Sequence, residues 1–123
     1  MLNVGNAFLI PTPDYETKHL YILIAKEKSS TKALMVNVTS YKPGCDCSCI
    51  LSPGDHRFIT HRSIINYGDA IITDVSKIEE GIRTKLIEML DPVSTEVLKR
   101  IQGGALASLA IPFKCREFLR KNP

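Results

Sequence analysis

The side chains best suited to chemistry gather in residues 33–67, which hold three of the four cysteines and two of the three histidines. Each of these two histidines has an arginine next to it in sequence. Imidazole exchanges protons near neutral pH, and guanidinium pairs well with phosphate oxygens. The group therefore predicts a phosphate site, although a solvated turn after Gly54-Asp55 accounts for part of it as simply. Its members are His56, Arg57, His61, Arg62 and Ser63.

The cysteines of this stretch, Cys45, Cys47 and Cys49, alternate with other residues. On an extended segment this spacing places three sulfurs on one face, where they could share a zinc ion with His56 or Cys115. Zinc sites usually pair their cysteines as C-x2-C, and cysteine is also an ordinary small apolar residue of buried strands. The pattern favours packing and leaves a zinc site as the alternative.

Apolar runs of strand length surround these residues and must position them. The run 33–38 ends at the hydroxyl pair Thr39-Ser40, which can also open a turn. The last two runs are either two strands or one long strand bent at Gly68-Asp69. Together the runs predict five to six strands in a strongly bent antiparallel sheet or barrel. They cover residues 7–10, 19–25, 33–38, 49–51, 63–67 and 70–73.

From Ser76 onward the apolar period changes to that of helices. Ser76 and Glu79 have the spacing of a capping box, and apolar residues then recur every fourth position as far as Leu90. Asp91-Pro92 predicts the start of a second helix, and Gly103-Gly104 predicts its end. We therefore expect two helices in this part of the chain.

A third short helix is predicted over residues 112–120, with Cys115, Phe118 and Leu119 on its buried side. The predicted fold class is α+β, a small antiparallel barrel with C-terminal helices packed at one end. A length of 123 residues suits a single domain, with the barrel in about 5–75 and the helices in about 76–121.

The charge balance is 16 basic against 13 acidic residues, which permits an anionic partner without requiring one. No apolar run approaches the roughly 18 residues that span a bilayer. The N-terminus has no basic region of the kind that opens a secretory signal. We therefore expect a cytoplasmic protein with no membrane association, whose cysteines start as thiols.

The order of these features resembles the PemK/MazF-like toxin family. Gly5 precedes the first strand, His19 opens the second, and Val38-Thr39-Ser40 closes the third. Ser63-Ile64-Ile65 is similar to the S-V-x strand of the family, and Ile72-Thr73-Asp74 lies where that region ends in Ile-Asp. The resemblance covers roughly residues 5–75 and rests on the ordered combination.

This resemblance implies an SH3-like barrel and a metal-independent endoribonuclease that needs no cofactor. Such enzymes are generally homodimers, are neutralised by an antitoxin protein, and cut single-stranded RNA by attack of the 2′-hydroxyl on the adjacent phosphate. That reaction needs a base, an acid and donors or cations for the phosphoryl oxygens. The resemblance implies that Thr39-Ser40 contacts the phosphate. It also places His19 where many members carry an arginine that faces the scissile phosphate.

One branch of the family has an arginine and an aspartate after the S-V-x strand as acid and base, whereas this chain has Asn66-Tyr67-Gly68-Asp69. We therefore expect His19, His56 and His61 to supply the proton transfers, with an arginine beside one of them as the cation. The alternative is a catalytically inactive barrel that binds a protein or a nucleic acid.

Overall fold

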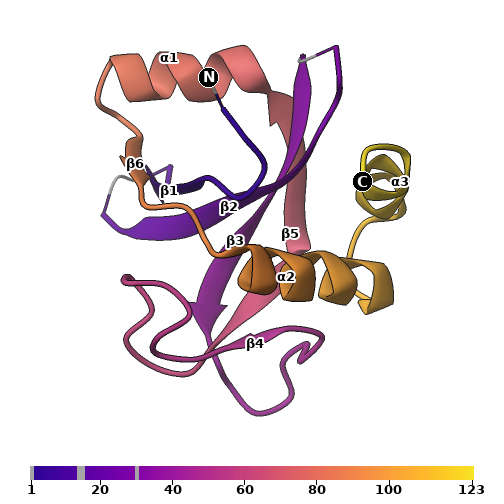
Figure 1. Ribbon diagram of the computed structural model, residues 1–123. Helices are drawn as coiled ribbons and strands as arrows, with labels where there is room; N and C mark the ends of the chain where they lie inside the picture. Colours follow the sequence, from indigo (N-terminus) through magenta and orange to yellow (C-terminus); the bar gives the residue numbers. More distant parts are fainter. Residues whose placement is uncertain (1, 14–15, 30) are drawn as a thin grey trace.

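The computed structural model describes residues 2–13, 16–29 and 31–123. The prediction of an α+β fold is confirmed, because these residues form six strands and three helices. The strands form one antiparallel sheet that curls into a half-barrel (Figure 1). The elements are β1 (Ala7–Pro11), β2 (Lys18–Lys26), β3 (Lys32–Ser40), β4 (Ile50–Leu51), β5 (Ser63–Asp74), α1 (Val75–Arg83), β6 (Glu88–Leu90), α2 (Thr95–Ala107) and α3 (Phe113–Lys121).

The strand order in the sheet is β4-β5-β3-β2-β1-β6, with the long strands β3 and β5 side by side. Met35 of β3 pairs with Ile71 of β5, and Asn37 pairs with Asn66. Residues 67–70 of β5 therefore lie opposite the single residue between Met35 and Asn37. Such an excess of residues bends a strand and increases its twist. Of the two possibilities that the sequence left open, the structure has one long strand, bent at residues 67–70.

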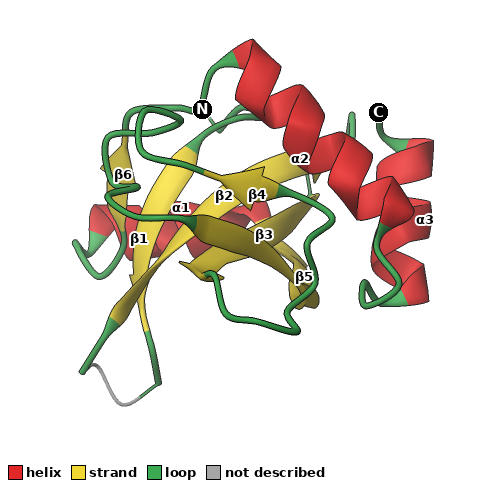
Figure 2. Ribbon diagram, turned by 90° about the horizontal axis from the view of Figure 1, so that it is seen from below, coloured by secondary structure: helices red, strands yellow, loops and turns green. Residues whose placement is uncertain are grey.

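Each face of the sheet has its own apolar core. The larger core joins β2, β3 and β5 to Val97 and Ile101 of α2 and to Cys115 and Leu119 of α3. The smaller core lies on the other face, where α1 contributes Ile78. Figure 2 accordingly shows α2 and α3 side by side and α1 on the opposite side of the sheet. The two layers leave one end of β2 and β3 uncovered by helices.

The helix predicted from Ser76 to Leu90 is shorter than the apolar pattern indicated, because α1 ends at Arg83. Gly81 explains the early end: a side chain there would collide with Ile87, so the following segment can fold back onto the helix. Leu90 then lies in β6, which pairs with the free edge of β1. Sheet pairing satisfies backbone groups that a longer helix would have left unpaired at that edge.

The second helix was predicted to start at Asp91-Pro92 and end at Gly103-Gly104, and both predictions are wrong. α2 starts at Thr95, with the hydroxyl of Ser94 accepting a hydrogen bond from the Val97 N–H at 3.1 Å. The helix continues through both glycines to Ala107. Gly104 faces the sheet, where an added Cβ would collide with the hydroxyl of Tyr67. This glycine permits close helix–sheet packing and is not a helix stop.

The third predicted helix is confirmed as α3, which spans Phe113–Lys121 and buries Cys115 and Leu119. Phe118 packs against the larger core with part of its ring exposed. None of the helices in the described part of the chain is long and apolar enough to cross a membrane.

Candidate functional site

A pocket of about 280 Å³ opens at the uncovered ends of β2 and β3. Its polar side chains come from three separate segments: the start of β2, the end of β3, and the loop that leads into β5. Apolar side chains of β1, β2 and β3, together with Phe58 and Ile59 of the loop before β5, form the rest of its wall. The polar residues that line it are Lys18, His19, Thr39, Ser40, His61 and Ser63. The fold thus brings together five of the residues singled out in the sequence, and it adds a lysine.

His61 and Ser40 are in direct contact in this pocket. The Nε2 atom of His61 lies 2.8 Å from the Oγ atom of Ser40, and its Nδ1 atom lies 3.4 Å from the hydroxyl of Thr60. Both His61 and Ser40 are exposed to solvent. The backbone of His61 is fixed because the Ser63 hydroxyl donates to its carbonyl oxygen at 2.9 Å. The arrangement presents an accessible imidazole that can exchange a proton with a hydroxyl group.

His19 and Thr39 reach the pocket from neighbouring strands. Tyr21 pairs with Asn37 in the antiparallel register of β2 and β3, and two residues further along each strand are His19 and Thr39. Residues two apart on a strand share a face, so these two side chains lie on the same side of the sheet end. Both are half-buried. Strand pairing therefore sets the position of the second imidazole.

The pocket is suited to an anion. The side chain of Lys18 is exposed at its edge, and the two imidazoles add further hydrogen-bond donors. None of the described residues that line the pocket carries a carboxylate. A cation in an open, hydroxyl-rich pocket is an arrangement that favours phosphate oxygens.

His56 was predicted as a catalytic residue, but the structure places it outside the pocket. Its ring is buried, with Nε2 donating to the Asp91 carbonyl oxygen at 2.6 Å. Nδ1 accepts a hydrogen bond from the Phe58 N–H at 3.1 Å. Both ring nitrogens are therefore occupied by the backbone of the protein itself. His56 holds the loop in place, and we do not retain it in the candidate site.

The two predicted arginines also lie outside the pocket wall. Arg57 is mostly exposed and forms an ion pair with Asp91 at 3.5 Å. The guanidinium of Arg62 stacks on the ring of Tyr41, 4.3 Å from its centroid. The Tyr41 N–H donates to the Arg62 carbonyl oxygen at 3.1 Å, which ties the loop to the end of β3. The cation that lines the pocket is Lys18.

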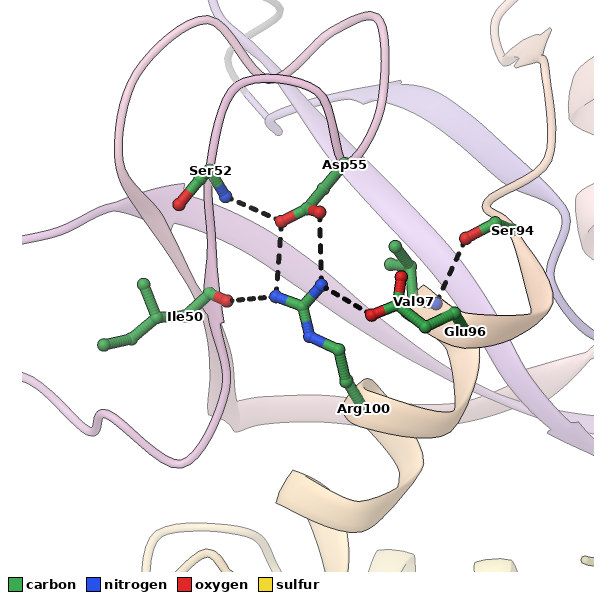
Figure 3. Close-up of polar contacts among 7 residues, drawn as sticks. All are labelled: Ile50, Ser52, Asp55, Ser94, Glu96, Val97 and Arg100. Atoms are coloured by element: carbon green, nitrogen blue, oxygen red, sulfur yellow. Dashed lines mark hydrogen bonds and ion pairs between the residues drawn. The ribbon is translucent and has the colours of Figure 1, made fainter.

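Arg100 of α2 fixes the turn that begins the pocket loop (Figure 3). Its guanidinium binds both carboxylate oxygens of Asp55, at 3.1 and 3.3 Å, and donates to the Ile50 carbonyl oxygen at 2.8 Å. The Ser52 N–H also donates to Asp55, at 2.8 Å. Partial burial raises the pKa of Asp55, but these hydrogen bonds and the charge of Arg100 outweigh it and keep the pKa below its ordinary value. A charged clamp thus anchors the loop that carries His61.

The cysteines do not share one face as the alternating pattern suggested. Residues 41–49 form an irregular loop, in which Cys47 is exposed and Cys49 is buried in the core. Cys115 is fully buried, with its thiol 3.6 Å from the Ala70 carbonyl oxygen. Within residues 2–13, 16–29 and 31–123, no three His, Cys, Asp or Glu side chains are grouped to hold a metal ion. The structure gives the zinc alternative no ligand set.

Lys18, Phe58 and Arg100 were missed in the sequence. Phe58 lines the pocket with 44% of its surface exposed, so its ring is accessible to a bound ligand. Lys18 directly precedes His19, and this neighbour was a signal that could have been used. Arg100 carried no signal, because its contact with Asp55 joins residues 45 positions apart.

Comparison with known proteins adds no relative: no family model, no curated protein and no solved structure matches this chain. The candidate site is therefore argued from its own geometry.

Proposed function

We propose that this protein is a metal-independent endoribonuclease that cleaves single-stranded RNA in the pocket between β2, β3 and the β5 loop. One observation carries the proposal: the pocket combines two imidazoles, a lysine and three hydroxyls. Two imidazoles can supply the base and the acid that transesterification requires, and an ammonium group can stabilise the charge that builds on the phosphoryl oxygens. The assignment of the half-barrel as SH3-like and the resemblance to PemK/MazF-like toxins belong to the same proposal.

In this mechanism His61 is the base. Its Nε2 atom contacts the Ser40 hydroxyl at 2.8 Å, so the nitrogen already faces a hydroxyl group in the free protein. The 2′-hydroxyl of the substrate takes the place of that partner, loses its proton to Nε2, and attacks the adjacent phosphorus. His19 protonates the departing 5′-oxygen. Lys18, Thr39 and Ser40 bind the non-bridging oxygens, which carry more charge in the transition state than in the ground state.

Phe58 gives the pocket a place for a base. Its ring is exposed at the pocket wall, and its backbone N–H is held by the buried ring of His56. Stacking of a nucleobase on an aromatic ring contributes about 1–3 kcal/mol and requires an unstacked, single-stranded base. This feature favours single-stranded over duplex RNA as the substrate.

The test is cleavage of a short single-stranded RNA in EDTA, with product ends identified by mass spectrometry. The wild-type protein should leave 2′,3′-cyclic phosphate ends. Removing His19 or His61 should each lower the rate about 100-fold or more, since general acid–base groups contribute about 10² to 10⁴. Substrate with a 2′-deoxy sugar at the cleaved position should bind and remain uncut.

Matched variants separate binding from chemistry. Lys18→Ala should weaken RNA binding and cleavage, whereas Lys99→Ala removes an exposed lysine of α2 outside the pocket and should change neither. Phe58→Ala should raise KM, and Phe58→Tyr should restore it. RNA binding that depends on Lys18 without any cleavage would instead support the inactive binding module. The absence of both RNA binding and RNA cleavage would refute both proposals.

The dimer and the antitoxin belong to the same proposal through the resemblance. An active nuclease should arrest growth when it is expressed, and a co-expressed cognate antitoxin should relieve the arrest. Sedimentation velocity on the purified chain checks the homodimer. If cells tolerate expression of the protein and the purified protein still cleaves RNA, the toxin assignment is contradicted and the nuclease assignment is not.

A further inference from the structure

Cys45 and Cys47 form a pair of thiols whose geometry is independent of the RNA site. Their sulfur atoms lie 3.7 Å apart, and the Cys47 thiol also donates to the Cys45 carbonyl oxygen at 3.5 Å. Both cysteines are free, Cys47 being exposed and Cys45 partly exposed. A disulfide has an S–S length of about 2.05 Å, so the two sulfur atoms must approach each other by roughly 1.7 Å for a bond to form.

The residue between the two cysteines is firmly anchored. One carboxylate oxygen of Asp46 accepts from the Ser48 N–H at 2.9 Å and from the Ser48 hydroxyl at 2.5 Å. The other accepts from the buried Ser108 hydroxyl at 2.6 Å, which joins the loop to the segment between α2 and α3. Burial raises the pKa of Asp46, but these hydrogen bonds outweigh it and the pKa lies below its ordinary value. The anchor holds the two thiols close together before any reaction.

We propose that Cys45 and Cys47 are a thiol–disulfide exchange site that a small disulfide, such as oxidised glutathione, converts to an intramolecular disulfide. The exposed Cys47 reacts first: its thiolate attacks one sulfur of the small disulfide, forms a mixed disulfide and releases one thiolate. The Cys45 thiolate then attacks the Cys47 sulfur, forms the protein disulfide and releases the second thiolate. The protein loses two protons and two electrons, and the small disulfide is reduced to two thiols.

Other groups around the pair set its reactivity. The pKa of Cys47 is raised, first by its hydrogen bond with Cys45 and then by slight desolvation and the charges of Cys45 and Asp46, while the positive charge of Arg62 partly offsets these effects. Because the thiolate is the nucleophile, the exchange accelerates as pH rises. Arg62 holds this charge near the loop through its stacking on Tyr41.

The remaining two cysteines serve as internal controls. Cys49 and Cys115 are buried, and burial is the largest cause of the raised pKa of each thiol. Buried thiols in apolar surroundings react slowly. The folded protein therefore contains two thiols that can exchange and two that cannot.

The experiment titrates the folded protein with mixtures of reduced and oxidised glutathione, followed by acid quenching, unfolding, alkylation and intact mass measurement. The wild-type chain should lose two hydrogen atoms and keep two alkylatable thiols, with fragmentation placing the bond between Cys45 and Cys47. Cys47→Ser should instead carry glutathione on Cys45. Accumulation of mixed disulfides on the wild-type chain, or a bond to Cys49 or Cys115, would overturn the proposal.

A second variant tests the anchor and keeps the result interpretable. Asp46→Ala should shift the ratio of oxidised to reduced glutathione at half-oxidation upward by on the order of tenfold, because lost hydrogen bonds lower the effective concentration of one thiol at the other. Glu79→Ala, which removes one negative charge on α1, should leave the midpoint unchanged. Circular dichroism checks that each variant is folded. An unshifted midpoint in a folded Asp46→Ala variant would refute the anchoring argument.

Discussion

Replacement of Arg100 by methionine should both destabilise the protein and loosen the pocket loop. The variant loses two hydrogen bonds to Asp55, one to the Ile50 carbonyl oxygen and a longer contact with Glu96 at 3.4 Å. Hydrogen bonds to charged groups contribute about 1.5–3 kcal/mol when well shielded. Because 39% of the Arg100 side chain is exposed, solvent screening lowers the expected cost to about 1–2 kcal/mol. Methionine keeps most of the apolar stem, so the loss reports on the charge and its hydrogen bonds.

The pH dependence of this loss identifies its source. The pKa of Asp55 is lower in the folded protein than in the unfolded chain, so the pair stabilises the fold above the unfolded value of about 3.9. Its contribution is lost as pH falls through the folded pKa, where the carboxyl group becomes protonated. The free energy of unfolding of Arg100→Met and wild type should therefore differ at neutral pH and converge in acid.

Urea unfolding of four proteins measures the effect: wild type, Arg100→Met, Asp55→Asn and the double variant. The two single changes should be non-additive by about 1 kcal/mol at neutral pH, since the residues contact each other. The Arg100→Met variant should also cleave RNA more slowly while it remains folded, because the clamp anchors the loop that carries His61. Additive single changes, or an undiminished difference in acid, would refute the clamp argument.

Three further predictions follow from packing and burial. Gly104→Ala should destabilise by about 1–3 kcal/mol because its Cβ meets Tyr67, Ser48 and Cys49, whereas Gly103→Ala, with open space around it, should stabilise by about 0.5–1 kcal/mol; thermal unfolding of both variants decides this, and equal effects would contradict it. His56→Gln should cost about 1–3 kcal/mol in urea unfolding through lost backbone contacts, with kcat for RNA reduced far less than in His61→Ala; loss of activity at full stability would restore His56 as a catalytic candidate. Burial raises the pKa of Tyr67, so stability should decline as pH rises above about 10, where the unfolded chain ionises first; Tyr67→Phe should make that decline shallower, the remainder coming from the buried thiols of Cys49 and Cys115, and an unchanged alkaline profile would contradict the assignment.

The strands were predictable because their cause is local. The apolar runs that become β1, β2 and β3 have the length of strands and are bounded by polar or turn residues, so the sequence pattern alone locates them. The same holds for α3, whose apolar residues recur with a helical period. These elements agree with the sequence prediction within a few residues.

The glycines of the helical half show where the sequence pattern gave wrong helix ends. Gly103-Gly104 has the composition of a helix stop, yet Gly104 is required by the approach of Tyr67, a residue of β5. Gly81 likewise leaves room for Ile87, a residue of the segment that follows α1. Both roles depend on which segments meet in the folded chain. Local propensity carries no information about such contacts.

The sequence named five of the polar residues that line the pocket, but it could not show which of the candidate residues come together in the fold. His19, Thr39, Ser40 and His61 come together because β2 pairs with β3 and because the loop before β5 folds over the strand ends. His56 has the same side chain as His61 and is likewise followed by an arginine, but its ring turns inward to the Asp91 carbonyl oxygen. Only the folded backbone distinguishes the two histidines.

The most direct test of the central claim is phosphorus NMR of a single-stranded RNA dinucleotide incubated with the protein in EDTA. We expect the resonance of a 2′,3′-cyclic phosphate to grow with wild type and to be absent with His61→Ala and with His19→Ala, all three proteins being folded. A rate unchanged in both variants would contradict the assignment of the pocket. No cyclic phosphate from the wild-type protein with any single-stranded RNA would contradict the proposed activity.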